Sequence, residues 1–384
     1  MNKPRITAAI LICIYCFCLI LIGRYAYKRP LYNWDMLGYS ALVIQKTYKD
    51  VNEIHGKTYE TIKEDIPEAN YILQVAGTER RKKWATQPNE FYQILPFYAV
   101  KPLYIEILNL FYKQGFSLPI STVLPSIISF LLIGALLFYW LVKNLKISWA
   151  FATSLLIMSS GPVLSLARLS TPDSLSTFLL LFSFYFIIER PSLRWTFLLM
   201  ALSLFARLDN IIPCICILSF LFFSGKWYKK VKPLPYITMM SFLIIIYFGI
   251  TITTLAPFGW SPLYYPTFMR YVNLSGTEQL HFSLAGYLSL LYSQVITALL
   301  YFNFSIFLLF LLLTLYPSGF QFRKFSFNQQ FALLLAAVIF LKFILFPDLS
   351  DRFNMAYYLA LIILFIKQYQ TLLSSKSNNL KLEL

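Results

Sequence analysis

The sequence predicts an all-α membrane protein of about ten transmembrane helices, with a long extracytoplasmic loop after the first helix. Hydrophobic residues make up 58% of the 384 residues and the mean hydropathy is +0.62, a composition that is typical of multi-span membrane proteins and excludes a soluble domain. Apolar segments near the ~20 residues needed to cross ~30 Å of hydrocarbon recur along the chain. Lysine and arginine gather on one side of these segments, as the positive-inside rule requires.

The first hydrophobic segment, Ile6–Ile22, follows Lys3 and Arg5. It has no convincing small-residue cleavage site, so we interpret it as a retained helix, span 6–24, rather than a removed signal peptide. Nine further spans are predicted from the apolar segments that follow. They cover 121–142, 148–167, 172–188, 193–207, 210–224, 234–256, 292–315, 329–346 and 354–370.

Several of these spans have unusual lengths. The spans 193–207 and 210–224 hold barely 15 residues, so they require local thinning of the bilayer or shelter by neighbouring helices. The apolar run Leu284–Leu315 is too long for one upright crossing. We expect either a tilted helix or a crossing preceded by a helix at the surface, and count one crossing in both cases.

The basic charge follows the predicted topology. The net charge is +16, which in a soluble protein would suggest nucleic acid as a partner. With the spans above, however, 15 Lys and Arg and only two acids, Glu189 and Glu383, fall on the side that carries both termini. This side is therefore the cytoplasm, and no nucleic-acid partner is expected.

The remaining sequence forms two outer loops and a tail around a single domain, 1–375. The first loop, 25–120, is nearly neutral, and its stretch 91–104 is aromatic and interrupted by prolines, which predicts helices lying along the membrane. A crossing over Ile94–Tyr112 instead would invert the charge bias downstream, which rules against it. The second loop, 257–283, is rich in Pro, Gly and Tyr and is expected to be an ordered wall or lid. The polar tail, 376–384, is expected to be cytoplasmic and without regular structure.

Three predicted hairpin tips on the outer side carry opposite charges. Arg168 and Asp173 flank the first tip, Arg207 and Asp209 the second, and Asp348, Asp351 and Arg352 form the third, with Lys342 about one turn below it. Charges at membrane depth are costly unless they are paired or face a wet cavity, so each is a candidate functional group. The alternative is that they are ion pairs that tie helix ends together. Arginines around an outer cavity would suit phosphate oxygens.

Asp35 lies just beyond the first span, at the start of the long outer loop. An ionised carboxylate near its ordinary pKa of ~4 can accept a hydroxyl proton at neutral pH, so Asp35 is the candidate general base. The alternative is that Asp35 and Trp34 only anchor the chain where it leaves the membrane.

Other chemistries find little support in the sequence. The two histidines are His55 and His281, and the single Glu-x-x-His spacing, Glu278 to His281, needs further metal ligands. We therefore expect no metal and no cofactor. The five cysteines all lie in apolar spans and are expected to act as small packing residues. No Walker A, GxGxxG or GxSxG motif is present.

The layout resembles the GT-C glycosyltransferases, multi-span enzymes that take sugars from polyprenyl-phosphate carriers. The shared features are the acid after the first span, in Trp34–Tyr39, the long first outer loop with membrane-lying helices, and short spans with charged tips. The segment Thr171–Ser176 is similar to the Pro-Asp-Ala-Leu stretch of bacterial members, and Ala206–Asn210 is similar to their Arg-x-Asp-Asn tip. The resemblance covers residues 1 to about 225, and beyond them only the general layout and Asp351–Phe353.

This resemblance implies an inverting, metal-independent transfer in which Asp35 deprotonates the acceptor hydroxyl. The residues implied to bind the donor phosphate are Arg168, Arg207, Arg352 and Lys101. Those implied to support the site are Trp34, Tyr39, Asp173, Asp209 and Asp351. The implied partners are a polyprenyl-phosphate-linked sugar, a lipid, polysaccharide or protein acceptor in the cell envelope, and membrane lipids. The implied location is the bacterial cytoplasmic membrane, with the site facing the periplasm or the exterior.

Three other interpretations stay open. A lipid-linked sugar flippase or secondary transporter would usually show paired halves with broken helices near the midplane, whereas the polar residues here cluster at the outer face. A polysaccharide polymerase or ligase would use similar donors, but its large outer loop is expected late in the chain. A scaffold with a decayed site would tolerate the loss of Asp35.

Overall fold

The computed structural model describes residues 3–224, 233–255 and 283–380. Within these ranges the chain is helical and has no β-strand, and Leu31 and Leu169 form an isolated parallel bridge. Residues 256–282, which include almost all of the predicted second outer loop with Glu278 and His281, lie outside the described residues, as do the last four residues of the predicted tail.

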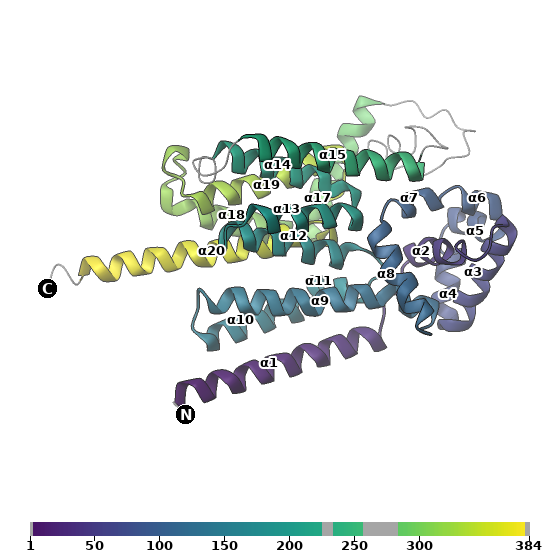
Figure 1. Cartoon of the computed structure of the whole chain (residues 1–384), viewed down its shortest axis with the longest axis horizontal. Coiled ribbons are helices and arrows are strands. Elements are labelled where there is room, and N and C mark those ends of the chain that lie inside the picture. The colour runs from purple at the N-terminus through teal and green to yellow at the C-terminus, as the bar shows by residue number, and fades with distance from the viewer. Residues whose placement is uncertain (1–2, 225–232, 256–282, 381–384) are drawn as a thin grey trace.

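The described chain forms a bundle of long helices with a compact lobe of short helices at one end (Figure 1). We call this lobe the cap and define it as residues 35–113. Its helices are α2 (Asp35–Ile44), α3 (Val51–Asp65), α4 (Glu68–Ala76), α5 (Glu79–Thr86), α6 (Pro88–Tyr92), α7 (Leu95–Ala99) and α8 (Pro102–Lys113).

The bundle holds the apolar helices that precede and follow the cap. They are α1 (Lys3–Lys28), α9 (Leu118–Val142), α10 (Ile147–Ser159), α11 (Gly161–Arg168), α12 (Asp173–Ile188), α13 (Leu193–Ala206), α14 (Ile211–Phe223), α15 (Pro233–Leu255), α17 (Leu284–Tyr301), α18 (Phe304–Leu315), α19 (Phe327–Leu345) and α20 (Asp351–Leu380). Short 3-10 turns lie at Leu208–Asn210 (η1), Tyr316–Ser318 (η5) and Phe322–Lys324 (η6).

The predicted all-α membrane architecture is confirmed at a coarse level. Among the described residues, six helices are long and apolar enough to cross a membrane, namely α1, α9, α15, α17, α19 and α20, and the number rises to eight if each of two bent pairs is one span. The predicted crossings 172–188, 193–207 and 210–224 correspond to the shorter apolar helices α12, α13 and α14, and α18, the second part of the predicted crossing 292–315, is also short. The figure of about ten crossings therefore stays a prediction.

Two predicted spans are broken in the structure. The span 148–167 bends by 61° at Ser160, because Gly161 and Pro162 follow and a proline cannot donate to the preceding turn. The run Leu284–Leu315 is divided at Phe302 and Asn303 into α17 and α18, and α17 alone is long and apolar enough to span. A single tilted helix therefore does not describe this run, and the count of one crossing stays a prediction.

The segment 91–104, predicted to lie along the membrane, contains α6, α7 and the start of α8. The helices from Pro88–Ala99 and Pro102–Lys113 meet at 109°, so they do not form one straight crossing. The predicted tail is helical in its first part, since α20 continues to Leu380 with no Gly or Pro to end it. The expectation of a tail without regular structure is wrong for these residues.

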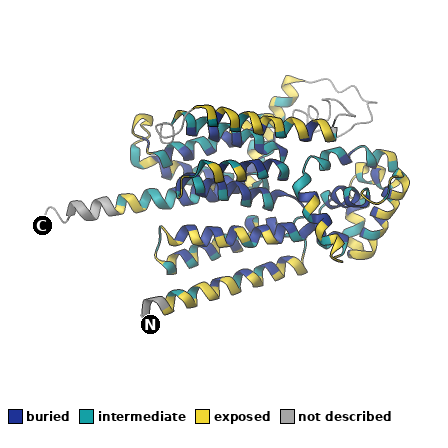
Figure 2. Ribbon diagram, in the orientation of Figure 1, coloured by how far each residue is buried: buried dark blue, intermediate teal, exposed yellow. Residues whose placement is uncertain are grey.

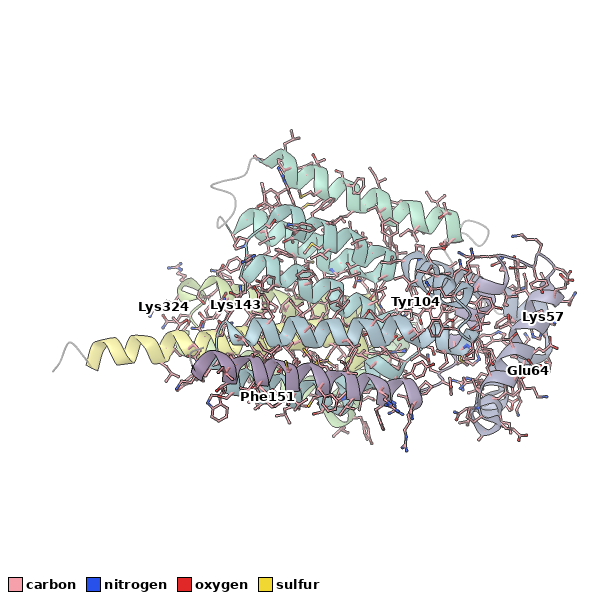
Figure 3. All side chains as sticks on the ribbon, turned by 60° about the horizontal axis from the view of Figure 1, so that its bottom comes forward. Lys57, Glu64, Tyr104, Lys143, Phe151 and Lys324 are labelled. Atoms are coloured by element: carbon pink, nitrogen blue, oxygen red, sulfur yellow. The ribbon has the colours of Figure 1, made fainter. Side chains whose placement is uncertain are left out.

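Both ends of the described chain lie at the same end of the bundle. The start of α1 and the last turns of α20 are both at the end of the bundle away from the cap (Figure 1). Lys143 and Lys324, two cations predicted on the cytoplasmic side, lie at that same end, whereas Lys57 and Glu64 lie on the cap (Figure 3). The labelled charges that the sequence predicts on the cytoplasmic side and on the outer side therefore lie at opposite ends of the molecule.

Burial divides the bundle into central and peripheral helices. The large side chains of Phe130, Trp140 and Phe184, on α9 and α12, are fully buried. By contrast, only 17% of the spanning window is buried in α1 and in α15, whose outer faces are exposed (Figure 2). These exposed faces are apolar, as expected for helices that contact lipid.

The cap has its own aromatic core and is joined to the bundle by hydrogen bonds and packing. Trp34, Trp84 and Phe91 are among the buried residues of this core. Tyr104, labelled in Figure 3 near the junction of cap and bundle, donates through its hydroxyl to the Thr122 carbonyl of α9 at 2.5 Å. These contacts hold the start of α2 against the ends of the bundle helices, where the candidate site lies.

Candidate functional site

A cavity of about 680 Å³ lies where the cap meets the bundle. Its charged lining residues are Asp35, Lys101, Asp173, Arg207, Asp209 and Arg352. Its apolar lining comes mainly from the cap and from the spans, through Phe97, Val100, Ile211, Ile212, Tyr247, Leu345, Phe346 and Phe353. The cavity suits a ligand that has both a charged and an apolar part.

Helix N-termini converge on the charged side of this cavity. The lining residues Asp35 and Asp173 are the first residues of α2 and α12, Lys101 precedes α8, and Arg352 is the second residue of α20. A helix N-terminus carries unsatisfied N–H groups and a partial positive charge, so several N-termini together favour an anionic group.

Asp35 is positioned by an extended segment that joins α1 to the first bundle tip. Leu31 N donates to the Arg168 carbonyl at 2.8 Å, and Ser170 N donates to Asn33 Oδ1 at 3.0 Å. Asn33 Nδ2 in turn donates to Asp35 Oδ2 at 2.8 Å. The carboxylate is about one-third exposed, so it is oriented by its neighbours and still open to the cavity.

Tyr98 holds the second carboxylate oxygen of Asp35. Its hydroxyl donates to Asp35 Oδ1 at 3.2 Å. Burial raises the pKa of Tyr98 well above its ordinary value, and the neighbouring Asp35 raises it further, so the hydroxyl stays a proton donor. The ring of Tyr98 lies directly over Gly38 of α2, where a Cβ atom would be only 2.6 Å from Tyr98 Cδ2. Gly38 therefore permits this contact.

Arg207 is the centre of a buried charge network. Its Nε and Nη2 donate to the two carboxylate oxygens of Asp209 at 2.9 and 3.1 Å, and its Nη1 pairs with Asp173 Oδ1. Lys342 Nζ lies 2.9 Å from Asp209 Oδ2. Asp173, whose side chain is only 1% exposed, also accepts from Thr171 Oγ1 at 2.8 Å. All three nitrogens of Arg207 are thus occupied by carboxylates.

Arg352 is less completely paired than Arg207. Its Nη1 lies 3.5 Å from Asp35 Oδ2 and 3.8 Å from Asp173 Oδ2, distances that are too long for strong hydrogen bonds. The ring of Phe353 lies beside both guanidinium groups, 4.4 Å from Cζ of Arg207 and 4.5 Å from Cζ of Arg352. This contact holds Arg352 in place while it keeps donor capacity for a ligand.

Lys101 lies in the turn between α7 and α8, outside the six candidate spans. Its Nζ donates to the Phe97 carbonyl at 3.1 Å and lies over the rings of Tyr39 and Tyr98, at 5.3 and 5.2 Å from their centres. Burial lowers the pKa of Lys101 to about 8, although the nearby Asp35 opposes this shift. Among the described residues no carboxylate lies within 4 Å of its ammonium group.

The structure brings together most, but not all, of the predicted site residues. Arg168 does not line the cavity, and its Nε donates to the Arg29 carbonyl at 2.6 Å. The partner of Asp173 is therefore Arg207 of the next tip and not Arg168 of its own. Asp351 is also outside the lining and accepts from the backbone and side chain of Asn303, at 2.9 and 2.6 Å.

Of the predicted supporting residues, Tyr39 lines the cavity, whereas Trp34 packs behind it. The Trp34 ring lies 4.5 Å from that of Trp84 and 6.0 Å from that of Tyr98. Sequence reasoning assigned no role to Asn33 or Tyr98, the two residues that donate to Asp35. For Asn33, its place two positions before Asp35 was the only signal in the sequence that could have indicated the contact. Tyr98 lies 63 residues after Asp35, so no local pattern could have indicated that contact.

The bundle tip beside Asp35 is fixed by serine and threonine side chains of α9. Thr122 Oγ1 donates to Ser170 Oγ at 2.8 Å, and Ser126 Oγ donates to the Thr171 carbonyl at 2.9 Å. Ser174 Oγ donates back to the Ser126 carbonyl at 2.9 Å. Such interhelical bonds between small polar residues are common in membrane helices, and here they set the position of Asp173.

The charged residues that line the cavity balance, since Lys101, Arg207 and Arg352 face Asp35, Asp173 and Asp209. Lys342, which does not line the cavity, adds a further positive charge through its ion pair with Asp209. Each nitrogen of Arg207 already has a carboxylate partner, so the cations least committed to carboxylates at this site are Lys101 and Arg352. Within the described ranges no group of three or more His, Cys, Asp and Glu gathers as a metal-ligand set. No protein-family model, no curated protein and no solved structure matches the chain.

Proposed function

We propose that the protein is a membrane glycosyltransferase that moves a sugar from a polyprenyl-phosphate carrier to an acceptor of the cell envelope. The observation that carries this proposal is the composition of the cavity. A partly exposed carboxylate, Asp35, faces two cations with remaining donor capacity, Lys101 and Arg352, beside an apolar wall built by α14, α15 and α19. We place the protein in a bacterial cytoplasmic membrane, with this cavity on the outer side.

In the proposed reaction Asp35 takes the proton of the acceptor hydroxyl. The hydroxyl oxygen forms a bond to the anomeric carbon while the bond from that carbon to the phosphate oxygen breaks, so that the configuration inverts. The electron pair leaves with the polyprenyl phosphate, which becomes more negative. General base catalysis of this kind contributes about 10²- to 10⁴-fold to a rate.

Lys101 and Arg352 are the proposed ligands of the leaving phosphate. Preorganised cations and helix N-termini at a developing negative charge are worth several kcal/mol to a transition state, so this step needs no metal ion. Arg207 is assigned a positioning role, because its nitrogens are occupied by Asp173 and Asp209. Arg168 is left out of the donor site, since it does not line the cavity.

We propose that the apolar wall binds the part of the polyprenyl chain that is nearest to the phosphate. Tyr247 of α15 and Leu345 of α19 line the cavity from two spanning helices, with Ile212 of α14 also in the wall. A chain lying here would keep the carrier phosphate near the membrane surface and beside Lys101. The acceptor is a lipid, polysaccharide or protein hydroxyl that reaches Asp35.

The rate should depend on pH through Lys101. Because the pKa of Lys101 is about 8, its ammonium group is charged below that pH and mostly neutral above it. We expect kcat/KM for the donor to fall by up to about tenfold per pH unit above pH 8, since kcat/KM reports the free enzyme. Lys101→Arg, whose guanidinium stays charged, should remove this fall. An unchanged alkaline profile in Lys101→Arg would exclude Lys101 as a phosphate ligand.

The function itself is tested by mass spectrometry of envelope glycans, glycolipids and lipid-linked sugars from cells that lack the protein. One discrete sugar should disappear from the envelope and return with the wild-type protein. Its lipid-linked donor should accumulate on the outer leaflet, where an added glycosidase can remove the sugar.

The same experiment separates the open alternatives. A donor trapped on the inner leaflet would identify a flippase or transporter instead. Shorter polymer chains with every sugar still present would identify a polymerase, and an unchanged envelope would exclude the transferase.

A further inference from the structure

The cap end of α1 carries a basic cluster that the cavity does not use. Its members are Arg24, Lys28, Arg29 and Arg168. In the part of the chain that the structure describes, none of them has a carboxylate within 4 Å. The first acid of the whole chain is Asp35, so residues 1–34 hold no negative side chain that could compensate them.

Two of these guanidinium groups are held at one aromatic ring. Cζ of Arg29 lies 5.7 Å and Cζ of Arg168 lies 5.5 Å from the ring centre of Tyr25. Arg168 Nε also donates to the Arg29 carbonyl at 2.6 Å, which fixes the tip after α11 against the end of α1. Arg29 follows directly after the last residue of α1, and its backbone N donates to the Tyr25 carbonyl at 3.0 Å, which keeps it one turn beyond Tyr25. Like charges gathered in this way repel one another unless an anion lies between them.

Several exposed cations of the cap are compensated by acids, in contrast to this cluster. On the cap, Lys46, Lys57, Lys82 and Lys83 each lie 2.5 to 2.9 Å from a glutamate carboxylate. In the cavity, Arg207 is bound by Asp173 and Asp209. The cluster at the end of α1 therefore differs from these paired cations, since it has four positive charges and no acid among its neighbours in the described chain, and a bound anion would compensate it.

The position of the cluster indicates where that molecule lies. Residues Ile6–Lys28 form an apolar span whose surface is mostly unburied, and the cluster occupies its last turns. Tyr25 and Tyr27 are 41% and 42% exposed there. Aromatic rings with polar tips beside cations are typical of the head-group layer. Arginine forks match phosphate oxygens in that layer.

We propose that Arg29 and Arg168, held at Tyr25 and flanked by Arg24 and Lys28, bind the phosphate group of a membrane-lipid head group. The inference does not rest on the proposed glycosyltransferase activity. The apolar tails of this lipid would lie along the exposed face of α1, which continues directly from the cluster.

The test measures lipid selectivity of the intact protein in nanodiscs of phosphatidylcholine with a minority of phosphatidylglycerol. Native mass spectrometry should find phosphatidylglycerol on the wild-type protein in excess of its share of the bilayer. The variant R29Q/R168Q should bind phosphatidylglycerol at least about tenfold more weakly. The matched control K57Q/K82Q removes two exposed cations that already have glutamate partners, and it should keep the wild-type selectivity.

Two further variants distinguish a site that depends on the arrangement of these side chains from a general attraction of anionic lipid to the positive charge. Tyr25→Leu leaves all four cations but removes the ring that holds two of them, so it should also lose selectivity, while Tyr25→Phe should retain it. Equal phosphatidylglycerol binding by R29Q/R168Q and the control, or full binding by Tyr25→Leu, would overturn the proposal. Displacement of the lipid by inorganic phosphate at equal concentration would assign the site to a soluble phosphate and overturn the lipid assignment.

Discussion

Replacing Asp35 with asparagine should lower the turnover of the proposed sugar transfer by about 10²- to 10⁴-fold while the proposed donor binds at least as tightly as before. The rate falls because the amide cannot take the acceptor proton. Donor affinity is kept or improved because the substitution removes a negative charge close to the site of the donor phosphate. Purified protein in nanodiscs, with separate measurements of kcat and donor Kd, checks both parts of this expectation.

The matched control is Asp50→Asn. Asp50 is an exposed acid of the same lobe, and its side chain accepts from the backbone of Asn52 and Glu53 at the start of α3. Asparagine caps a helix about as well as aspartate, so this variant should fold and react normally. If Asp35→Asn keeps full turnover while the control also does, Asp35 is not the base, and the transport and scaffold interpretations gain support.

Replacing Arg207 with methionine should destabilise the fold by about 3–5 kcal/mol. This substitution keeps much of the side-chain volume but leaves Asp173 and Asp209 without their main counter-charge, and removing one partner of a buried ion pair typically costs this much. Asp173 is especially sensitive, since its side chain is 1% exposed. Unfolding in detergent, followed by tryptophan fluorescence, measures the loss.

Arg168→Met provides the comparison for Arg207→Met, because Arg168 lies at the surface with one backbone hydrogen bond and no carboxylate partner in the described chain. It should cost no more than about 1 kcal/mol. Adding Asp173→Asn and Asp209→Asn to Arg207→Met should restore part of the lost stability. If Arg207→Met is no worse than Arg168→Met, the network around Arg207 is not a structural element.

The sequence predicts the helical elements well because their apolar segments are long and their ends are marked by charge. It does not predict the break at Phe302 and Asn303, where the apolar run continues without Gly or Pro and the interruption depends on Asn303 pairing with Asp351, 48 residues away. The three short helices predicted as crossings, α12, α13 and α14, show the same limit. Whether 13 to 16 apolar residues cross a membrane is decided by neighbouring helices as well as by composition.

The sequence predicts that charged residues at the outer helix tips form the candidate site, but it does not predict which of these residues contact one another. Asp35, Arg207, Asp209 and Arg352 line one cavity, as their shared outer position indicated. Arg168 looks equivalent to Arg207 in the sequence, yet the pairing of Leu31 with Leu169 turns it toward α1. No local pattern encodes that pairing, because it joins segments more than 130 residues apart.

The close packing of Tyr98 on Gly38 has an evolutionary consequence. Any substitution at position 38 places an atom in the space of the Tyr98 ring, so the two positions cannot change independently. A relative that carries a side chain at position 38 must have lost or moved the ring at position 98, and with it the hydroxyl that orients Asp35. Retention of this glycine–tyrosine pair, more than of the aspartate alone, should therefore mark the descendants that kept the same chemistry.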